Sequence, residues 1–132
     1  MSSTHQKVAT MFGAIFVLAA FAGFFASGFS MQTSMLLGLF PVNLVHNLLH
    51  LAFGGWGLWA ALNSDRAARS YCQFSGLIYL ALAGLGLTYG DRLESFLPIH
   101  GNDIWLHALI GGVLSAFGFA GETITRRLAK AS

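Results

Sequence analysis

The sequence contains no Asp, Glu, Lys or Arg between Val8 and Ser64, and charged residues make up only 9% of its 132 residues. Soluble proteins contain about 25% charged residues, so this chain cannot cover a water-facing surface in the usual way. Hydrophobic residues instead make up 55% of it. The composition predicts one membrane domain, residues 1–132, with the lipid bilayer as its main surroundings.

Cysteine and enzyme motifs are also scarce. Cys72 is the single cysteine, which excludes an internal disulfide and a metal cage of cysteines. The chain has no nucleophile elbow, phosphate-binding loop or paired-carboxylate motif. We therefore predict no catalytic residues, although Asp103 beside a histidine could act as an acid or base.

The sequence also contains long apolar stretches. Four of them have the length of about 20 residues that a helix needs to cross a hydrocarbon core of about 30 Å. Backbone N–H and C=O groups find no water in the bilayer, so such stretches must be helical. The predicted fold is an all-α bundle of four transmembrane helices, at about 8–29, 42–62, 71–89 and 104–121.

The basic residues indicate how these helices are oriented. If the helices alternate in direction, one side of the membrane receives six basic residues: Lys7, Arg66, Arg69, Arg126, Arg127 and Lys130. Only Arg92 falls on the other side. By the positive-inside rule, both termini and the loop at 63–70 are expected in the cytoplasm. The net charge of +2 therefore reflects topology, and we predict no nucleic-acid partner.

Two segments of the chain repeat one another, LFPVNLVHNLLHLAFGG (39–55) and FLPIHGNDIWLHALIGG (96–112). They align without a gap, and the matched positions are Pro41 with Pro98, His50 with His107, and Gly54-Gly55 with Gly111-Gly112. GAIFVLAAFAG (13–23) also corresponds loosely to GLIYLALAGLG (76–86). The chain is therefore interpreted as two tandem helical hairpins, about 8–62 and 71–121, related by a pseudo-two-fold axis along the membrane normal. Because the repeat needs its first helix, we expect that helix to be retained rather than cleaved as a signal peptide.

The second and fourth helices each carry a polar face. At about 100° per residue, His50 shares its face with Asn43, His46 and Asn47, and His107 shares its face with His100 and Asp103. Such groups face the bundle interior, because lipid cannot satisfy them. If Pro41 and Pro98 begin the two helices, His50 and His107 lie about 13 Å further in, near the middle of the membrane. We expect His46 and Asp103 about one turn closer to the outer surface.

These polar positions resemble those of a bacterial membrane family named only as domain of unknown function 4383. That family is similar in having four helices, with Asn-x-x-His-Asn-x-x-His opening the second and Asp-x3-His opening the fourth. The matching positions here are Asn43, His46, Asn47, His50, Asp103 and His107. His100 departs from the family pattern, which usually has an asparagine there. The resemblance implies a multi-pass protein of a bacterial inner membrane and supplies no activity.

The function of the polar residues has three interpretations. In the first, they only hydrogen-bond the helices together, at about 0.6 kcal/mol per bond, in a structural or partner-binding membrane subunit. In the second, they bind a transition metal ion or haem b. In the third, they form a proton or small-solute half-channel that opens to the outer face and uses histidine as the proton carrier.

The second interpretation, binding of a metal ion or haem, assigns a role to specific residues. A metal ion would be bound by His46, His50, Asp103 and His107, whereas a haem would take His50 and His107 as axial ligands. The supporting polar residues would be Asn43, Asn47, His100 and Asn102. We expect a haem to need the second and fourth helices on opposite sides of the bundle, with the double glycines admitting the porphyrin plane. A compact metal site would need those helices to be adjacent.

Small residues at helical spacing leave the assembly state open. Gly86-x3-Gly90 and Gly57-x3-Ala61 suit close contacts within the bundle or between protomers. A homo-oligomer and a partner in a membrane complex are therefore both compatible with the sequence.

Overall fold

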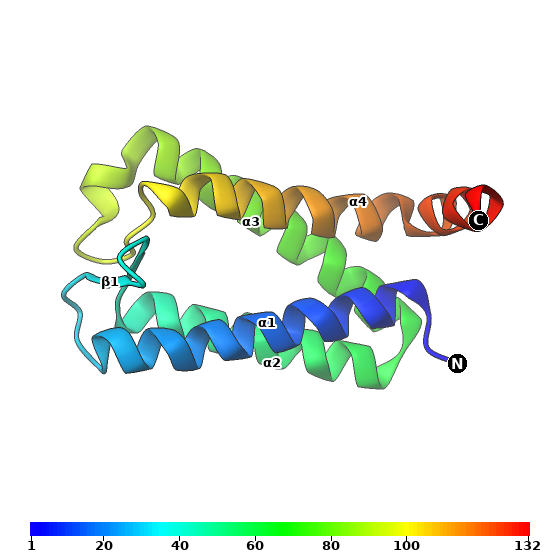
Figure 1. Cartoon of the computed structure of the whole chain (residues 1–132), viewed down its shortest axis with the longest axis horizontal. Helices are drawn as coiled ribbons and strands as arrows, with labels where there is room; N and C mark the ends of the chain where they lie inside the picture. Colours follow the sequence, from blue (N-terminus) through cyan, green and yellow to red (C-terminus); the bar gives the residue numbers. More distant parts are fainter.

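The computed structural model describes all 132 residues and contains four helices, which confirms the predicted mostly helical fold. They are α1 (Thr4–Ser27), α2 (Leu44–Asn63), α3 (Asp65–Leu93) and α4 (Asn102–Ala131). α1 packs along α2, and α3 packs along α4 (Figure 1). We call these pairs the first and second helical hairpins. α3 crosses from the end of α2 to the far end of the molecule, and α4 returns beside it (Figure 1).

Three of the helices are long and apolar enough to cross a membrane: α1, α3 and α4. α2 is shorter, at 20 residues, and His46, Asn47 and His50 reduce its apolar character. Large apolar side chains such as Leu18, Phe25 and Leu87 project from the outer faces of the helices and are mostly exposed. Such exposed apolar surface suits lipid, and the chain is therefore a helical membrane protein.

Glycines set the distance between the helices of each pair. A Cβ built on Gly54 would lie 2.7 Å from Val17 Cγ2 and 2.9 Å from the Gly13 carbonyl oxygen. A Cβ built on Gly111 would lie 2.6 Å from the Leu80 backbone nitrogen and 2.8 Å from the Gly76 carbonyl oxygen. No side chain larger than hydrogen fits at these crossings, because real Cβ atoms do not come so close to backbone atoms.

The second glycine of each double glycine has a different environment. A Cβ on Gly55 or Gly112 would meet nothing within 4 Å. The double glycines therefore serve the close approach of two helices through their first members only. This differs from the expected opening for a porphyrin plane, because α1 and α3 occupy the space beside Gly54 and Gly111.

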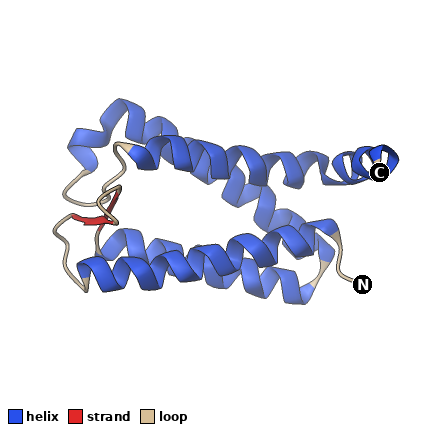
Figure 2. Cartoon of the chain, in the orientation of Figure 1, coloured by secondary structure: helices blue, strands red, loops and turns tan.

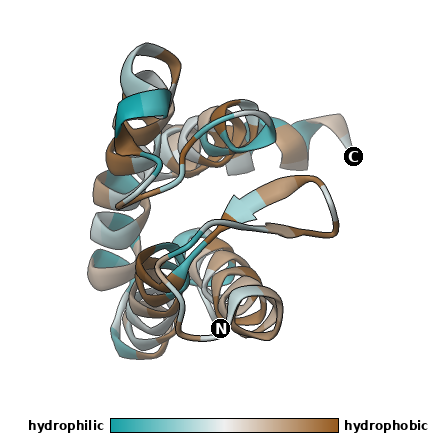
Figure 3. Cartoon of the chain, turned by 90° about the vertical axis from the view of Figure 1, so that its left-hand side faces the viewer, coloured by the Kyte–Doolittle hydropathy of each residue, from teal (hydrophilic) through white to brown (hydrophobic).

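A short β-hairpin that the sequence did not predict precedes α2. β1 (Ser34–Leu36) pairs antiparallel with β2 (Phe40–Val42), and Pro41 lies in β2 opposite Met35 (Figure 2). This β-hairpin lies between the two helical hairpins, at the end of the bundle away from both termini, which we call the outer end (Figure 3). The expectation that Pro41 and Pro98 begin helices is wrong, because α2 starts after its N-cap residue Asn43 and α4 after Gly101.

The later helix starts change the depth of the histidines. His50 is six residues into α2 and His107 five residues into α4, or about 9 Å and 7.5 Å at 1.5 Å per residue. Both therefore lie shallower than the expected 13 Å, between the outer end of the bundle and its middle. The predicted loop at 63–70 is also mostly helix, because Ser64 alone separates α2 from α3 and caps α3 through its side chain.

The glycine contacts lead to a stability prediction. Gly54→Ala and Gly111→Ala should each lower the free energy of unfolding by about 1–3 kcal/mol, because the new methyl group forces two helices apart. Gly55→Ala and Gly112→Ala are the matched controls and should be neutral or stabilising by up to about 1 kcal/mol, because alanine favours the helix. Unfolding in detergent micelles measures all four variants. Equal effects at neighbouring positions would contradict the packing described here.

Candidate functional site

Three histidines meet between the first and second helical hairpins. His46 and His50 lie one turn apart on α2, and His107 lies on α4. One ring nitrogen from each falls within 4.8 Å of the others. The ring centroid of His46 lies 4.5 Å from that of His50 and 5.9 Å from that of His107. We call these three residues the histidine cluster.

Asp103 lies beside the histidine cluster and contacts two of its members. Its carboxylate Oδ2 is 3.6 Å from His46 Nδ1, and its backbone oxygen is 2.6 Å from His107 Nδ1. The carbonyl can only accept, so Nδ1 of His107 carries the proton and Nε2 is left with a free lone pair. A histidine whose second nitrogen is engaged in this way has a fixed ring orientation, as metal-binding histidines usually have.

The cluster contains buried polar atoms without hydrogen-bond partners. Both ring nitrogens of His46, Nδ1 of His50 and Oδ2 of Asp103 have none. His46, His107 and Asp103 are each less than 5% exposed. Burying an unpartnered polar group costs about 1–3 kcal/mol, so four in one place need an explanation such as a bound ion or water.

Two aromatic rings position the histidines. The Phe16 ring of α1 stacks on His50 with centroids 5.7 Å apart, and the Tyr79 ring of α3 stacks on His107 at 5.1 Å. Phe16 and Tyr79 also stack on each other at 5.0 Å. Neither residue was predicted from the sequence. The signal was available, because Phe16 and Tyr79 occupy the same place in the aligned segments 13–23 and 76–86.

The space between these side chains is small and closed on its outer side. The cavity has a volume of about 10 Å³ and is lined by the histidine cluster, Tyr79 and apolar residues that include Ile99. Ile99, Pro41 and Pro98 are all less than 2% exposed and close the outer end of the bundle. A cavity of this size holds about one water molecule or one ion. A porphyrin does not fit between the stacked rings.

The arrangement of α2 and α4 was not among the expected alternatives. The two helices do not pack directly along their length, since α1 and α3 are their neighbours. Their histidine side chains nevertheless meet across the bundle. A compact site and opposed helices are therefore compatible, because imidazole rings from both sides reach the bundle centre.

The asparagines make hydrogen bonds to loops and to α1 and not to the imidazole rings of the cluster. Asn43 accepts a hydrogen bond from the His46 backbone N–H and donates to the carbonyl oxygens of Phe96 and Met31. Asn47 donates to the Ser27 hydroxyl at 2.8 Å and so joins α2 to α1. Both asparagine side chains are fully buried.

The other two supporting residues lie outside the cluster. Asn102 is at the start of α4, where it donates to the Leu39 carbonyl oxygen of the β-hairpin and accepts from Trp105 Nε1. His100 is partly exposed, with Nε2 3.7 Å from the Glu94 carboxylate. Of the predicted site residues, the structure therefore brings together His46, His50, Asp103 and His107.

Comparison with known proteins gives one match. The family described as "Domain of unknown function (DUF4383)" matches residues 6–120, which include every residue of the site. No curated protein and no solved structure matches the chain.

The hydrogen bonds of Asn43 lead to a prediction about the support of the site. Asn43→Ala removes the α2 cap and leaves two carbonyl groups without their donor, so it should lower the free energy of unfolding by about 2 kcal/mol or more. Asn43→Ser keeps an acceptor for the cap and should cost less. Asn102→Ala, at a partly exposed position, is the control and should cost under about 1 kcal/mol. Unfolding in detergent micelles gives the order, and a cost for Asn102→Ala as large as that for Asn43→Ala would contradict it.

Proposed function

The chain belongs to the DUF4383 family, a domain of unknown function, and we propose that it is a membrane protein that binds one divalent transition metal ion in its histidine cluster. The supporting observation is the meeting of three imidazoles, two of them buried and one partly buried, with ring nitrogens of His46 and His50 that have no partner in the protein. Three nitrogen ligands with a fourth open position are a common arrangement for zinc.

The ligands in this proposal are the ring nitrogens of His46, His50 and His107. Tetrahedral zinc places its nitrogen ligands about 3.4 Å apart, from bond lengths of 2.0–2.1 Å. The cluster nitrogens span up to 4.8 Å, so small side-chain rotations would close the site around an ion. Asp103 is better placed to orient His46 through Nδ1 than to bind the ion directly, which differs from the ligand role expected from sequence.

The chemistry of the donors favours borderline ions. Imidazole suits Zn²⁺, Cu²⁺ and Ni²⁺, whereas Mg²⁺ and Ca²⁺ prefer oxygen ligands. The site has no thiolate, because Cys72 lies elsewhere on α3. We therefore propose Zn²⁺ or Cu²⁺ as the ligand. A haem is less well supported, because Phe16 and Tyr79 fill the space beside the axial candidates.

The hydrogen-bond pattern separates this function from the structural alternative. If the polar residues only tied helices together, the histidines should bond to other helices. Asn43 and Asn47 do make such bonds to distant parts of the chain, whereas His46 and His50 make none. His107 bonds only to its own helix. The structural role thus falls to the asparagines, which leaves the histidines for a ligand.

A half-channel is less well supported than a closed site. Its expected entrance, His100, lies beside Glu94 and apart from the cluster. The buried side chains of Pro41, Pro98 and Ile99 lie at the outer end. A transport path would need these groups to move for each passage.

We also propose that α2 is a fourth membrane span and that both termini are cytoplasmic, in a bacterial inner membrane. α2 runs beside α1, an apolar helix of 24 residues, and its 20 residues have the length to cross the same hydrocarbon layer. The six basic residues near the termini and the α2–α3 junction support the orientation.

The two helical hairpins are further proposed to be repeats. Gly54 packs on Gly13 as Gly111 packs on Gly76, and these are matched positions in the sequence alignment. Phe16 stacks on His50 as Tyr79 stacks on His107. Both kinds of contact support the pseudo-two-fold relation. Clearly unequal costs of Gly54→Ala and Gly111→Ala would count against it.

Metal binding can be tested with the purified protein in detergent. Added Zn²⁺ or Cu²⁺ should bind at one ion per chain and raise the melting temperature. Saturation at 100 times the dissociation constant corresponds to about 2.7 kcal/mol of stabilisation. The variants His46→Ala, His50→Ala and His107→Ala should each lose most of this stabilisation.

His100→Ala is the matched control, because His100 lies outside the cluster. Its metal-induced stabilisation should equal that of the wild type. A folded wild-type protein that binds neither ion would overturn the proposal, as would a His107→Ala variant that keeps full binding.

The proposed orientation can be tested with reporter fusions. A reporter active only in the cytoplasm should be active when fused after Ser132 and inactive when inserted at the β-hairpin tip, at Gly38. A reporter active only outside the cytoplasm should give the reverse pattern. Activity of the same reporter at both sites would contradict the three spans proposed between them, and with them the assignment of α2 as a span.

A further inference from the structure

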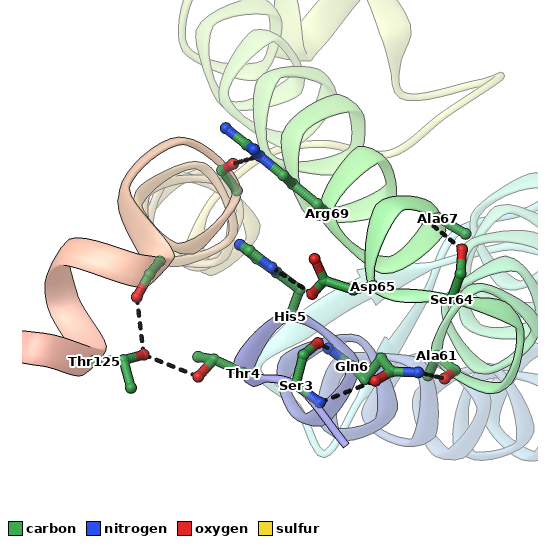
Figure 4. A network of polar contacts seen from close by, with 12 residues as sticks. Ser3, Thr4, His5, Gln6, Ala61, Ser64, Asp65, Ala67, Arg69 and Thr125 are labelled. Atoms are coloured by element: carbon green, nitrogen blue, oxygen red, sulfur yellow. Dashed lines mark hydrogen bonds and ion pairs between the residues drawn. The ribbon is translucent and has the colours of Figure 1, made fainter. Parts of the chain in front are cut away.

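The end of the bundle opposite the histidine cluster contains a second polar network. His5 of α1 is 4% exposed, and its Nδ1 lies 2.8 Å from the Asp65 carboxylate of α3 (Figure 4). Thr4 of α1 shares a hydrogen bond of 2.8 Å with Thr125 of α4. Three helices thus converge at this end, and polar side chains from each of them line the space between them.

A cavity of about 120 Å³ lies within this network. It is lined by His5, by Arg69 and by residues 118–123 of α4. Figure 4 shows the side chains of His5 and Arg69 extending toward α4 from two different helices. We call it the inner pocket. It is separate from the histidine cluster, and its function does not depend on the proposed metal ion.

The charges around the inner pocket leave one cation without a counterion. Asp65 is paired with His5, and Glu122 is paired with Arg126 at 3.8 Å. Arg69 donates from Nε to the Gly118 carbonyl oxygen at 3.3 Å, and no carboxylate lies within 4.0 Å of it. The two terminal nitrogens of its guanidinium are therefore free to bind a singly charged anion.

The position of the inner pocket along the helices indicates which kind of anion it would meet. The apolar run of α3 begins at Tyr71, just after Arg69, and the apolar run of α4 ends at Gly121. The pocket therefore lies where the hydrocarbon layer gives way to the head groups. Phe119 lines it as well and is 57% exposed, so an acyl chain would have an apolar side chain beside it.

We propose that the inner pocket binds the phosphodiester of a membrane phospholipid. Arg69 would donate two parallel hydrogen bonds to the phosphate oxygens, the geometry for which a guanidinium is suited. With protons on both ring nitrogens, His5 would donate from Nε2 to the phosphate while Nδ1 stays bonded to Asp65. Thr123, which also lines the pocket, would contribute its hydroxyl. Basic pockets between membrane helices commonly hold lipid head groups in this way.

Lipid retention tests this assignment. The full chain is extracted in a mild detergent, and the phospholipid that remains bound per chain is measured by native mass spectrometry. Arg69→Gln should lose retained phospholipid about tenfold, because it loses a charge-assisted pair of bonds. Arg127→Gln is the matched control: it removes one basic charge at the same end but does not line the pocket, so it should retain lipid like the wild type. Equal losses in the two variants would show only general attraction to the membrane surface and would overturn the site.

Two further measurements keep the result interpretable. Arg69→Lys keeps the positive charge but loses the planar guanidinium that donates two parallel hydrogen bonds. It should therefore retain lipid at a level between the wild type and Arg69→Gln. Unchanged retention in both Arg69 variants overturns the proposal. If Arg69→Gln proves unstable and only Arg69→Lys can be measured, unchanged retention in Arg69→Lys overturns it. In lipid-free detergent, inorganic phosphate should stabilise the wild type far less than added phospholipid does. Equal, Arg69-dependent stabilisation by phosphate would identify a free-anion site instead of a lipid site.

Discussion

A polar atom surrounded by hydrocarbon has no water to bond, and this constraint governs the outer half of the bundle. Asn43 meets it within the chain, because it caps α2 and bonds to two loops. Asn47 meets it through Nδ2, which donates to Ser27, while its Oδ1 has no partner. His46 and His50 do not meet it. Because imidazole is a strong metal ligand and a poor filler of apolar space, the same constraint that explains the asparagines leaves the histidines needing a ligand.

The glycine crossings determine where these histidines can meet. Gly54 lets α2 approach α1, and Gly111 lets α4 approach α3, so each helical hairpin is a tight unit. Phe16 and Tyr79 then project from the partner helices and stack against His50 and His107. The imidazoles are thus held from the side by rings on the neighbouring helix, which limits their rotation before any ion is bound. A preorganised site of this kind binds more tightly, because less side-chain entropy is lost.

Sequence reasoning could identify the residues of the site because helical periodicity and the repeat both act on the chain locally. The grouping of His46, His50, Asp103 and His107 followed from one face on each of two helices. The two prolines led to a wrong prediction of the helix starts, because a proline suits both a first helical turn and an edge strand. Pro41 lies in β2, where its pairing with Met35 depends on a β-hairpin of three-residue strands. Pairing that short leaves no periodic signal in the sequence.

The expected choice between adjacent and opposed helices was also misleading, since it treated helix axes as though they fixed side-chain distances. α2 and α4 are separated by α1 and α3, yet their imidazoles reach a common point. The two helical hairpins are joined at the outer end through Asn43 and Asn102, and at the inner end through His5 and Thr4. Between these ends, Phe16 and Tyr79 stack across the two hairpins, and α2 and α4 meet through the histidine cluster. An ion bound there would add a link between α2 and α4, which do not otherwise pack along one another, so its binding energy would add to the stability of the whole bundle.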